Sequence, residues 1–175
     1  MPTRLAALAT ALLLSSVTAI PATPGHLDVV TANGPLVDLR PQQADPTDGA
    51  RARVVAVRVA GRTVTIMHLR GLDRTAAGRT FGAHVHVGPC VAGDGAAAGP
   101  HFNIDVHRGV TPPEVSPRTE IWLDFTVTPG GRGHAVSLVP FAVPSGAARS
   151  IVVHELATDP AGAAGPRLAC IGVPF

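Results

Sequence analysis

The sequence predicts an all-β fold, either a β-sandwich or a flattened barrel. Val, Ile and Thr occur in short alternating runs, the spacing of half-buried strands. Gly (19 residues) and Pro (17 residues) are frequent, and their clusters separate these runs at near-regular intervals. No stretch has a convincing helical period, and a hydrophobic content of 46% suffices for the core of one domain.

The first 19 residues are expected to be a secretory signal peptide. Arg4 supplies the positive charge, residues 5–17 are mostly apolar, and Val17-Thr18-Ala19 fits a small-residue cleavage site. An uncleaved anchor is the alternative. We therefore expect a secreted or cell-envelope protein that keeps no stable membrane span after processing.

Residues 20–50 are rich in Pro, Gly and Asp and are expected to form a loosely ordered N-terminal segment. Short edge strands are possible within it, at residues 27–30 and 36–39. The β domain proper is expected to span residues 51–175.

Seven or eight short strands are expected in total. Two alternating runs flank Ala60-Gly61, a connection typical of a hairpin, and a second hairpin is expected around Pro129-Gly130-Gly131. Residues 91–116 are dense in Gly, Pro and Ala and predict a long loop, which in a compact domain is usually functional. The strands expected in the domain are residues 53–59, 62–69, 81–87, 120–128, 134–139, 149–154 and 168–173.

Charge and cysteine content indicate which partners and which cellular compartment to expect. All 14 basic residues are Arg, which beside abundant Ala, Gly and Pro is typical of a GC-rich bacterial genome, and 12 acids nearly balance them. No polybasic run is present, so nucleic acid is not expected as a partner. Cys90 and Cys170 predict one disulfide in an exported protein, worth about 4 kcal/mol by the chain-entropy estimate. Two buried free thiols are the alternative.

Four histidines attract attention. His84 and His86 are two residues apart in an expected strand, so their side chains share one face while Val85 points into the core. Two imidazoles at this spacing can bind one transition metal. His101 lies in the long loop and His154 ends a late strand. Alone, each of these has an ordinary explanation as a loop or strand-end histidine.

Together these stretches resemble the copper-zinc superoxide dismutase family, over about residues 50–173. Five motifs stand in the family's order, each with its key residue. The motifs are Phe81-Gly82-Ala83-His84-Val85-His86, Gly88-Pro89-Cys90, Gly99-Pro100-His101-Phe102-Asn103, Ser150-Ile151-Val152-Val153-His154-Glu155 and Gly165-Pro166-Arg167-Leu168-Ala169-Cys170.

The resemblance implies an eight-stranded Greek-key β-barrel or sandwich, the architecture of this enzyme family. It implies His84, His86 and His154 as copper ligands and His101 as the ligand that bridges copper and zinc where both metals are present. It also implies a disulfide between Cys90 and Cys170. Arg167 would attract and position the superoxide anion, and His101 would also carry a proton in catalysis.

The zinc half of the family's site is incomplete here. The family adds two histidines and an aspartate after the bridging histidine, whereas only His107 follows His101 in the loop. Glu120 falls roughly where the aspartate is expected. A structural zinc usually needs four protein ligands. Asp105 or Glu114 could complete the set, although the spacing does not require either.

The segment between His154 and Arg167 is also short. This short segment and the incomplete zinc half both resemble the copper-only branch of the family, and we expect a bacterial, secreted member of it. Zinc is then expected to be absent. Glu120 would instead accept the ring N–H of His101, with a solvent-facing role as the alternative, and His107 would be an ordinary loop histidine. Oligomeric state is not predicted.

The predicted function is therefore superoxide dismutase activity, an antioxidant oxidoreductase that converts superoxide to dioxygen and hydrogen peroxide with copper as cofactor. A non-catalytic domain of the same fold that binds or delivers copper is the alternative. A structural or adhesive sandwich without metal is a third, and requires four coincidental histidines. Trp122 is expected to pack, outside the site. Asp124 is expected to face solvent, with contact to a ligand ring as the alternative.

Overall fold

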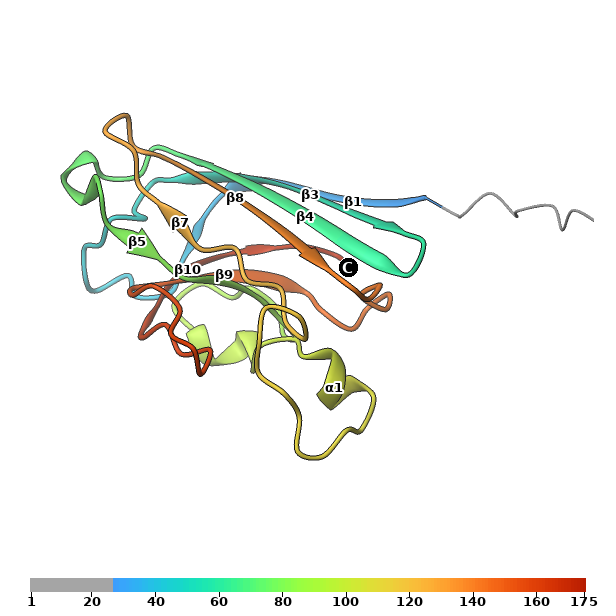
Figure 1. Cartoon of the computed structure of the whole chain (residues 1–175). Coiled ribbons are helices and arrows are strands. Elements are labelled where there is room, and N and C mark those ends of the chain that lie inside the picture. The colour runs from blue at the N-terminus through green and yellow to red at the C-terminus, as the bar shows by residue number, and fades with distance from the viewer. Residues whose placement is uncertain (1–26) are drawn as a thin grey trace, which may run out of the picture.

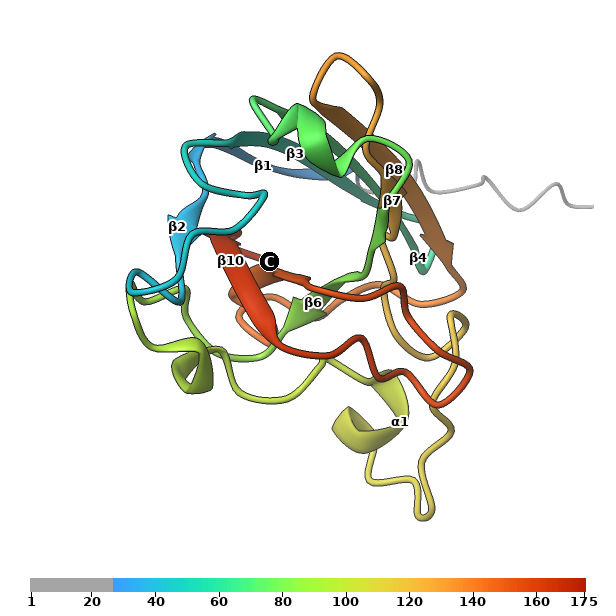
Figure 2. The ribbon, with the colours of Figure 1, turned by 90° about the vertical axis from the view of Figure 1, so that its left-hand side faces the viewer.

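The fold is known from a computed structural model that describes residues 27–175. The expected signal peptide, residues 1–19, lies outside the described residues. Two four-stranded antiparallel sheets pack face to face as a sandwich (Figures 1 and 2). The first sheet has the order β1 (Asp28–Pro35), β3 (Arg51–Val59), β4 (Arg62–Arg70) and β8 (Arg132–Val139). The second has the order β2 (Val37–Asp38), β10 (Arg167–Gly172), β9 (Ser150–His154) and β6 (Ala83–His86).

Short elements complete the molecule. A two-stranded sheet joins β5 (Thr80–Phe81) to β7 (Phe125–Thr126). The helical pieces are single turns: the 3₁₀ segments η1 (Arg74–Ala76) and η2 (Gly95–Ala98) and the helix α1 (Ile104–His107). The predicted all-β class and sandwich are confirmed. Among the described residues, no helix is long and apolar enough to cross a membrane.

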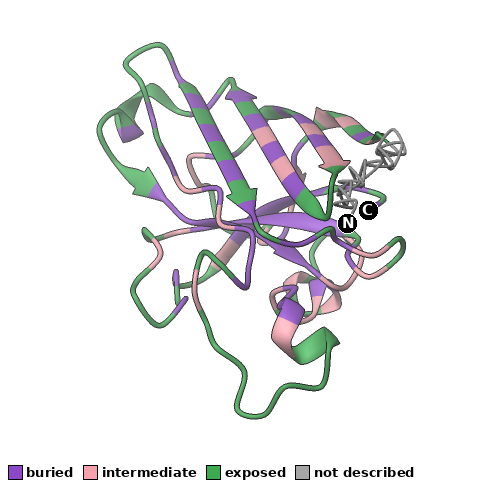
Figure 3. Cartoon of the chain, turned by 45° about the vertical axis from the view of Figure 1, so that its right-hand side comes forward, coloured by how far each residue is buried: buried purple, intermediate pink, exposed green. Residues whose placement is uncertain are grey.

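Alternating burial builds the core of the first sheet (Figure 3). Every second residue of β8 is buried, and β3 and β4 follow the same rule over most of their length. The predicted hairpin joins β3 to β4, which pair over their whole length. Its two turn residues, Ala60 (φ 48°) and Gly61 (φ 73°), both have positive φ. Two-residue turns of this kind match the twist of the strands they connect.

Both sheets take an edge strand from the N-terminal segment. β1 pairs with β3 in an eight-residue register, and β2 pairs with β10. The short edge strands expected at residues 27–30 and 36–39 are therefore present, as a longer β1 and as β2, and the sandwich begins before the expected domain start at residue 51.

The second predicted hairpin is wrong. β8 pairs along its length with β4, and its backbone bond to the stretch 120–128 lies at the turn itself, where Thr128 N–H donates to Arg132 O at 2.8 Å. That stretch instead bonds to β6 and β5: Leu123 N–H donates to Ala83 O, and β7 pairs with β5. Ile121, Leu123, Phe125 and Val127 are all buried, so alternate residues of this stretch form one buried face. An alternating pattern fixes the face of a strand but not its neighbour. The consequence is that residues 120–123 lie beside β6.

Candidate metal centre

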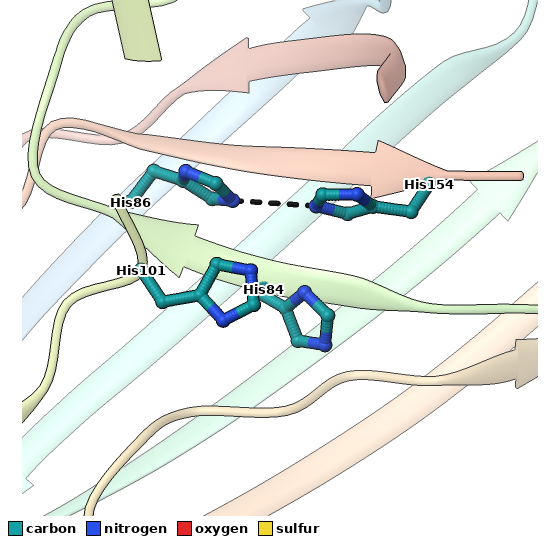
Figure 4. A group of neighbouring side chains, drawn as sticks. All are labelled: His84, His86, His101 and His154. Atoms are coloured by element: carbon teal, nitrogen blue, oxygen red, sulfur yellow. Dashed lines mark hydrogen bonds between the residues drawn. The ribbon is translucent and has the colours of Figure 1, made fainter. Parts of the chain in front are cut away.

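Three segments converge on one buried point of the second sheet (Figure 4). β6 carries His84 and His86, both fully buried, and β9 ends at His154, which is 4% exposed. His101 joins them because its backbone pairs with that of His86 in an isolated bridge. One ring nitrogen from each of the four histidines lies within 4.8 Å of the others. The structure therefore brings together all four histidines singled out in the sequence.

Backbone carbonyls orient two of these rings. Nδ1 of His86 lies 3.0 Å from Gly99 O, and Nδ1 of His154 lies 3.1 Å from Gly165 O. A carbonyl can only accept, so both Nδ1 atoms carry the hydrogen in the neutral rings. Both Nε2 atoms are then lone pairs, and they face each other at 3.3 Å. Neither can donate to the other, so this contact is repulsive unless a proton or a metal ion lies between them.

A carboxylate orients the third ring. Nδ1 of His101 donates to Glu120 Oε2 at 2.9 Å, so in the neutral ring Nε2 is the lone pair. Glu120 is 4% exposed and also accepts from Trp122 Nε1 at 2.9 Å and from Asn103 Nδ2 at 3.1 Å. Burial raises the pKa of Glu120, but the hydrogen bonds from His101, Trp122 and Asn103 outweigh it and lower the pKa overall. Glu120 is therefore ionised.

The ring of His84 is held through Nε2, whereas the other three rings are held through Nδ1. Thr158 Oγ1 lies 2.6 Å from Asp124 Oδ1, and the hydroxyl donates to that carboxylate. Nε2 of His84, 2.7 Å from the same hydroxyl, donates to it in turn. Nδ1 of His84 is then the lone pair, and it is buried without a hydrogen-bond partner in the described part of the chain.

Three of the rings are neutral at physiological pH. Burial, helped by the neighbouring imidazoles, lowers the pKa of His84 to about 2. Burial likewise lowers the pKa of His86 to about 3 and that of His154 to about 4, and the charge of Arg167 contributes to both. Neutral imidazole is the form that binds a metal ion.

These observations fit a transition metal. One nitrogen of each ring is tied to a protein acceptor, and the other is a lone pair in the cluster: Nδ1 of His84 and Nε2 of His86, His101 and His154. Four imidazole donors suit copper, and they also suit zinc or nickel. The buried four-histidine cluster can therefore hold copper.

Arg167 lies beside the cluster. It faces His154 across β9 and β10 in the strand register. Its guanidinium donates to Gly95 O and, at 2.7 Å, to Gly99 O. The Gly99 carbonyl also accepts from His86, so one carbonyl connects the cation to a ring of the cluster. Partial burial lowers the pKa of Arg167, and a guanidinium nonetheless stays charged.

A shallow hollow opens next to Arg167. It is lined by Leu39, Arg40, Gly95, Ala96, Gly99, Pro100 and Arg167. Arg40 is held there by an ion pair with Glu155 at 3.2 Å. Two guanidinium groups therefore border this hollow, and the charge of Arg40 is balanced by Glu155.

The structure does not assemble the zinc-side candidates into a second metal group. His107 ends α1, is exposed, and lies against Phe102 with ring centroids 5.9 Å apart. Within residues 27–175, neither His107 nor Glu120 belongs to a cluster of three or more candidate ligands. Glu120 instead accepts from the ring of His101, the role expected of it in a copper-only site, and it does not face solvent.

A disulfide joins Cys90 to Cys170, as predicted, with Cα atoms 5.6 Å apart and a sequence separation of 80. It ties the beginning of the long loop to β10, three residues after Arg167. The cross-link therefore holds the loop that carries Gly99 and His101 against the strand that carries Arg167.

Several residues of the site were not predicted. Thr158 gave no signal, and Asp124 was expected to face solvent, yet together they hold the ring of His84. Trp122 was expected only to pack, yet it donates to Glu120. Gly99 and Gly165 act through their carbonyl oxygens, which no side-chain pattern reveals.

Solved structures with the same architecture exist. A crystal structure of the clock protein EA4 matches with a TM-score of 0.56 and 16% identity, over 90% of this chain and 99% of that chain. A double mutant of a SOD-like protein from Bacillus subtilis matches with a TM-score of 0.54 and 19% identity, over 84% and 96%. This chain has the superoxide dismutase-like fold. Scans against protein-family models and curated proteins gave no match. At these identities the likeness establishes the superoxide dismutase-like fold alone.

Proposed function

We propose that this protein is a copper-dependent superoxide dismutase that works outside the cytoplasm with a single metal ion. The observation that carries the proposal is the convergence of four imidazole lone pairs, each fixed by a protein acceptor on the opposite side of its ring. The superoxide dismutase-like fold and the disulfide support it, since disulfides persist in oxidising compartments.

When bound, copper supplies the electron exchange, in which one superoxide is oxidised to dioxygen and a second is reduced to peroxide. The overall reaction consumes two superoxide anions and two protons and yields one dioxygen and one hydrogen peroxide. The chain must therefore attract an anion and deliver protons, and separate residues are suited to each task.

Arg167 is suited to attract the anion. Its fixed positive charge lies beside His86 and His154 and lowers the pKa of both, which places it within electrostatic reach of the cluster. Fixed charge near a site raises the rate at which a small ion of opposite sign arrives.

His101 is suited to deliver a proton. Nε2 faces the other rings, while Nδ1 stays bound to the ionised Glu120. The carboxylate stabilises the imidazolium that forms when Nε2 takes a proton, and it keeps the ring oriented in both states. Of the four histidines, His101 is the one with a carboxylate directly on its ring nitrogen, so it is the best placed to hold and release a proton at Nε2.

Glu120 also supports the single-metal assignment. A bridging histidine needs a partner on its second nitrogen, and in this chain the partner is a buried carboxylate with three hydrogen bonds. Zinc is therefore not required to orient the ring. Metal analysis of protein loaded with equal copper and zinc is expected to find about one copper and no tightly bound zinc per chain.

The test measures copper content and superoxide consumption of the loaded protein and of two histidine variants. His154→Ala should lose most of the copper and the activity. His107→Ala removes an exposed histidine outside the cluster and should keep both. Full activity in His154→Ala would refute the ligand assignment.

Arg167→Ala separates an enzyme from a copper-delivery domain. For the enzyme, the variant keeps its copper and loses turnover, and the loss shrinks at high salt because screening weakens attraction in the wild type. Tight copper binding with negligible turnover in the wild type would favour copper storage or delivery. Absence of copper binding would leave a structural sandwich.

A further inference from the structure

The outer face of the first sheet carries a group of basic side chains that is separate from the histidine cluster. At one end of this face, outward-pointing side chains of three adjacent strands are basic. We call this the cationic end and define it by its residues, Arg51, Arg53, His68, Arg70, Arg132 and His134, all of which are exposed.

Strand register places these residues in two rows. Arg51 pairs with Arg70 on the neighbouring strand, and Arg70 pairs with Arg132 on the next. Three guanidinium side chains therefore stand side by side across β3, β4 and β8, over about 10 Å. Like charges directly opposite each other on a sheet face are destabilising.

The second row runs parallel to the first, two residues further along. Arg53 pairs with His68, and His68 pairs with His134 with ring centroids 4.6 Å apart. Asn33 of β1 lies opposite Arg53 and extends the row. Two hollows lie between these side chains, one bordered by Asn33, Arg53 and Arg70 and the other by Arg70, Arg132 and His134.

Counter-charges are absent from this face. Within residues 27–175, none of the four arginines of the cationic end forms an ion pair. Asp28 is the one acid on β1, β3, β4 and β8; it lies at the opposite end of the sheet from Arg51 and pairs with Arg58. Residues 1–26 contain no Asp or Glu and cannot supply one. The repulsion within the rows is therefore left for an external anion to relieve.

We propose that the cationic end is a binding site for an acidic polysaccharide, whose carboxylate or sulfate groups pair with the arginines. Anionic groups repeated along a flexible chain fit two rows of cations separated by hollows, and a guanidinium binds such groups in a fork. The site would hold the protein on a polyanionic matrix.

Two other polyanionic partners fit the face less well. The outward positions of these four strands carry no Phe or Trp, so nucleic-acid bases find no large aromatic platform. An anionic bilayer is usually anchored by protruding aromatic side chains, whereas the apolar residues beside the cationic end are aliphatic and include the half-covered Val55 and Ile66. Both partners are outcomes of the test.

The experiment measures binding of the full chain to labelled heparin, a sulfated polysaccharide, between about 50 and 200 mM salt. The variant Arg53→Gln with Arg70→Gln is expected to bind about tenfold more weakly or worse, with a salt dependence lower by about 1.5 in log–log slope. The matched control is Arg62→Gln with Arg118→Gln, which removes the same charge from exposed positions at the other end of the sheet. It should bind within about twofold of the wild type.

Thermal unfolding confirms that both variants fold, and if the first does not, Arg51→Gln with Arg132→Gln replaces it with the same expectation. Equal weakening by the cationic-end variant and its control would overturn the site, as would no heparin binding by the wild type. Stronger binding to phosphatidylglycerol vesicles or single-stranded DNA than to heparin at the same salt would overturn the polysaccharide assignment. Superoxide consumption by the copper-loaded variants is a separate readout, which this site should not affect.

Discussion

Lowering the pH should destabilise the metal-free protein well before its carboxylates titrate. His84 and His86 have pKa values of about 2 and about 3 when folded, against about 6.5 for an unfolded histidine. Below pH 6.5 the unfolded state therefore binds more protons than the folded state, so the free energy of unfolding falls as the pH falls. The full stability is present above pH 6.5 and is lost progressively down to the folded pKa values.

The size of the effect follows from the same linkage. Between pH 7 and pH 5, each fully buried histidine that stays neutral in the folded state costs about 2 kcal/mol, so the pair costs about 4 kcal/mol. His154, with a pKa of about 4, adds a loss in the same direction. The pKa of Glu120 is lowered from 4.5, so this carboxylate contributes only below that window.

Urea unfolding of the metal-free protein at pH 7, 6 and 5 measures this loss. The variant His84→Gln with His86→Gln is the control, because glutamine does not titrate, and its stability should fall by about 4 kcal/mol less over the same range. Copper-loaded wild type should be more stable than the metal-free protein at each of these pH values, since bound metal stabilises the folded state. Equal pH slopes for wild type and control would refute the assignment of buried neutral rings.

Three further predictions concern residues around the cluster. Glu120→Gln replaces a carboxylate that accepts three hydrogen bonds by an amide with one oxygen acceptor, so at least one of the buried donors loses its partner. Unfolding should show a loss of about 1–3 kcal/mol of stability, and competition with a chelator should show copper binding about 10- to 100-fold weaker. Replacing Cys90 and Cys170 together by Ala should lower the free energy of unfolding by about 4 kcal/mol, whereas a loss below about 1 kcal/mol would show that the cross-link adds little. Gly88→Ala should destabilise strongly in thermal unfolding, because its Cβ would lie 2.1 Å from a backbone carbonyl oxygen of η2, and a melting temperature like that of wild type would contradict this packing.

The fold followed from the sequence where local pattern decides it. Alternation and the Ala60-Gly61 turn predicted β3 and β4, and both are in place. The error at residues 120–128 has a physical cause. Alternation identifies the buried face of a strand but not the neighbouring strand, and the short turn to β8 favoured β8 as the neighbour where the structure has β6. That error mattered, because pairing with β6 is what places Glu120 beside His101.

The candidate site was predictable in part. The two-residue strand period places His84 and His86 on one face, but nothing local brings His101 and His154 to them, and that expectation rested on the resemblance of spaced motifs. Thr158 and the carbonyl of Gly99 leave no pattern at all, since a hydroxyl and a backbone oxygen acquire their roles only through tertiary contact.

The cationic end is a second feature that a local sequence pattern does not reveal. Arg53, Arg70 and Arg132 are far apart in sequence, so a search for a polybasic run does not detect them. Cross-strand register collects them into one patch. A chain with balanced net charge can therefore present a strongly one-signed surface, and excluding polyanions from composition alone is unsafe for a β-sheet protein.

The hydrogen bonds on the outer nitrogens of the histidine rings explain how the cluster can lower the stability of the metal-free protein and still be arranged to bind a metal. The acceptors that fix His86, His101 and His154 come from separate parts of the chain and are already engaged in the described structure. The lone pairs are thus aimed at one point before any metal arrives, and the mutual repulsion of His86 and His154 is part of the folded state's energy. A metal that removes this repulsion binds the folded chain more tightly than the unfolded chain, and it stabilises the fold by an amount that rises with the logarithm of its affinity. The same arrangement that lowers the stability of the metal-free protein should therefore strengthen its hold on copper.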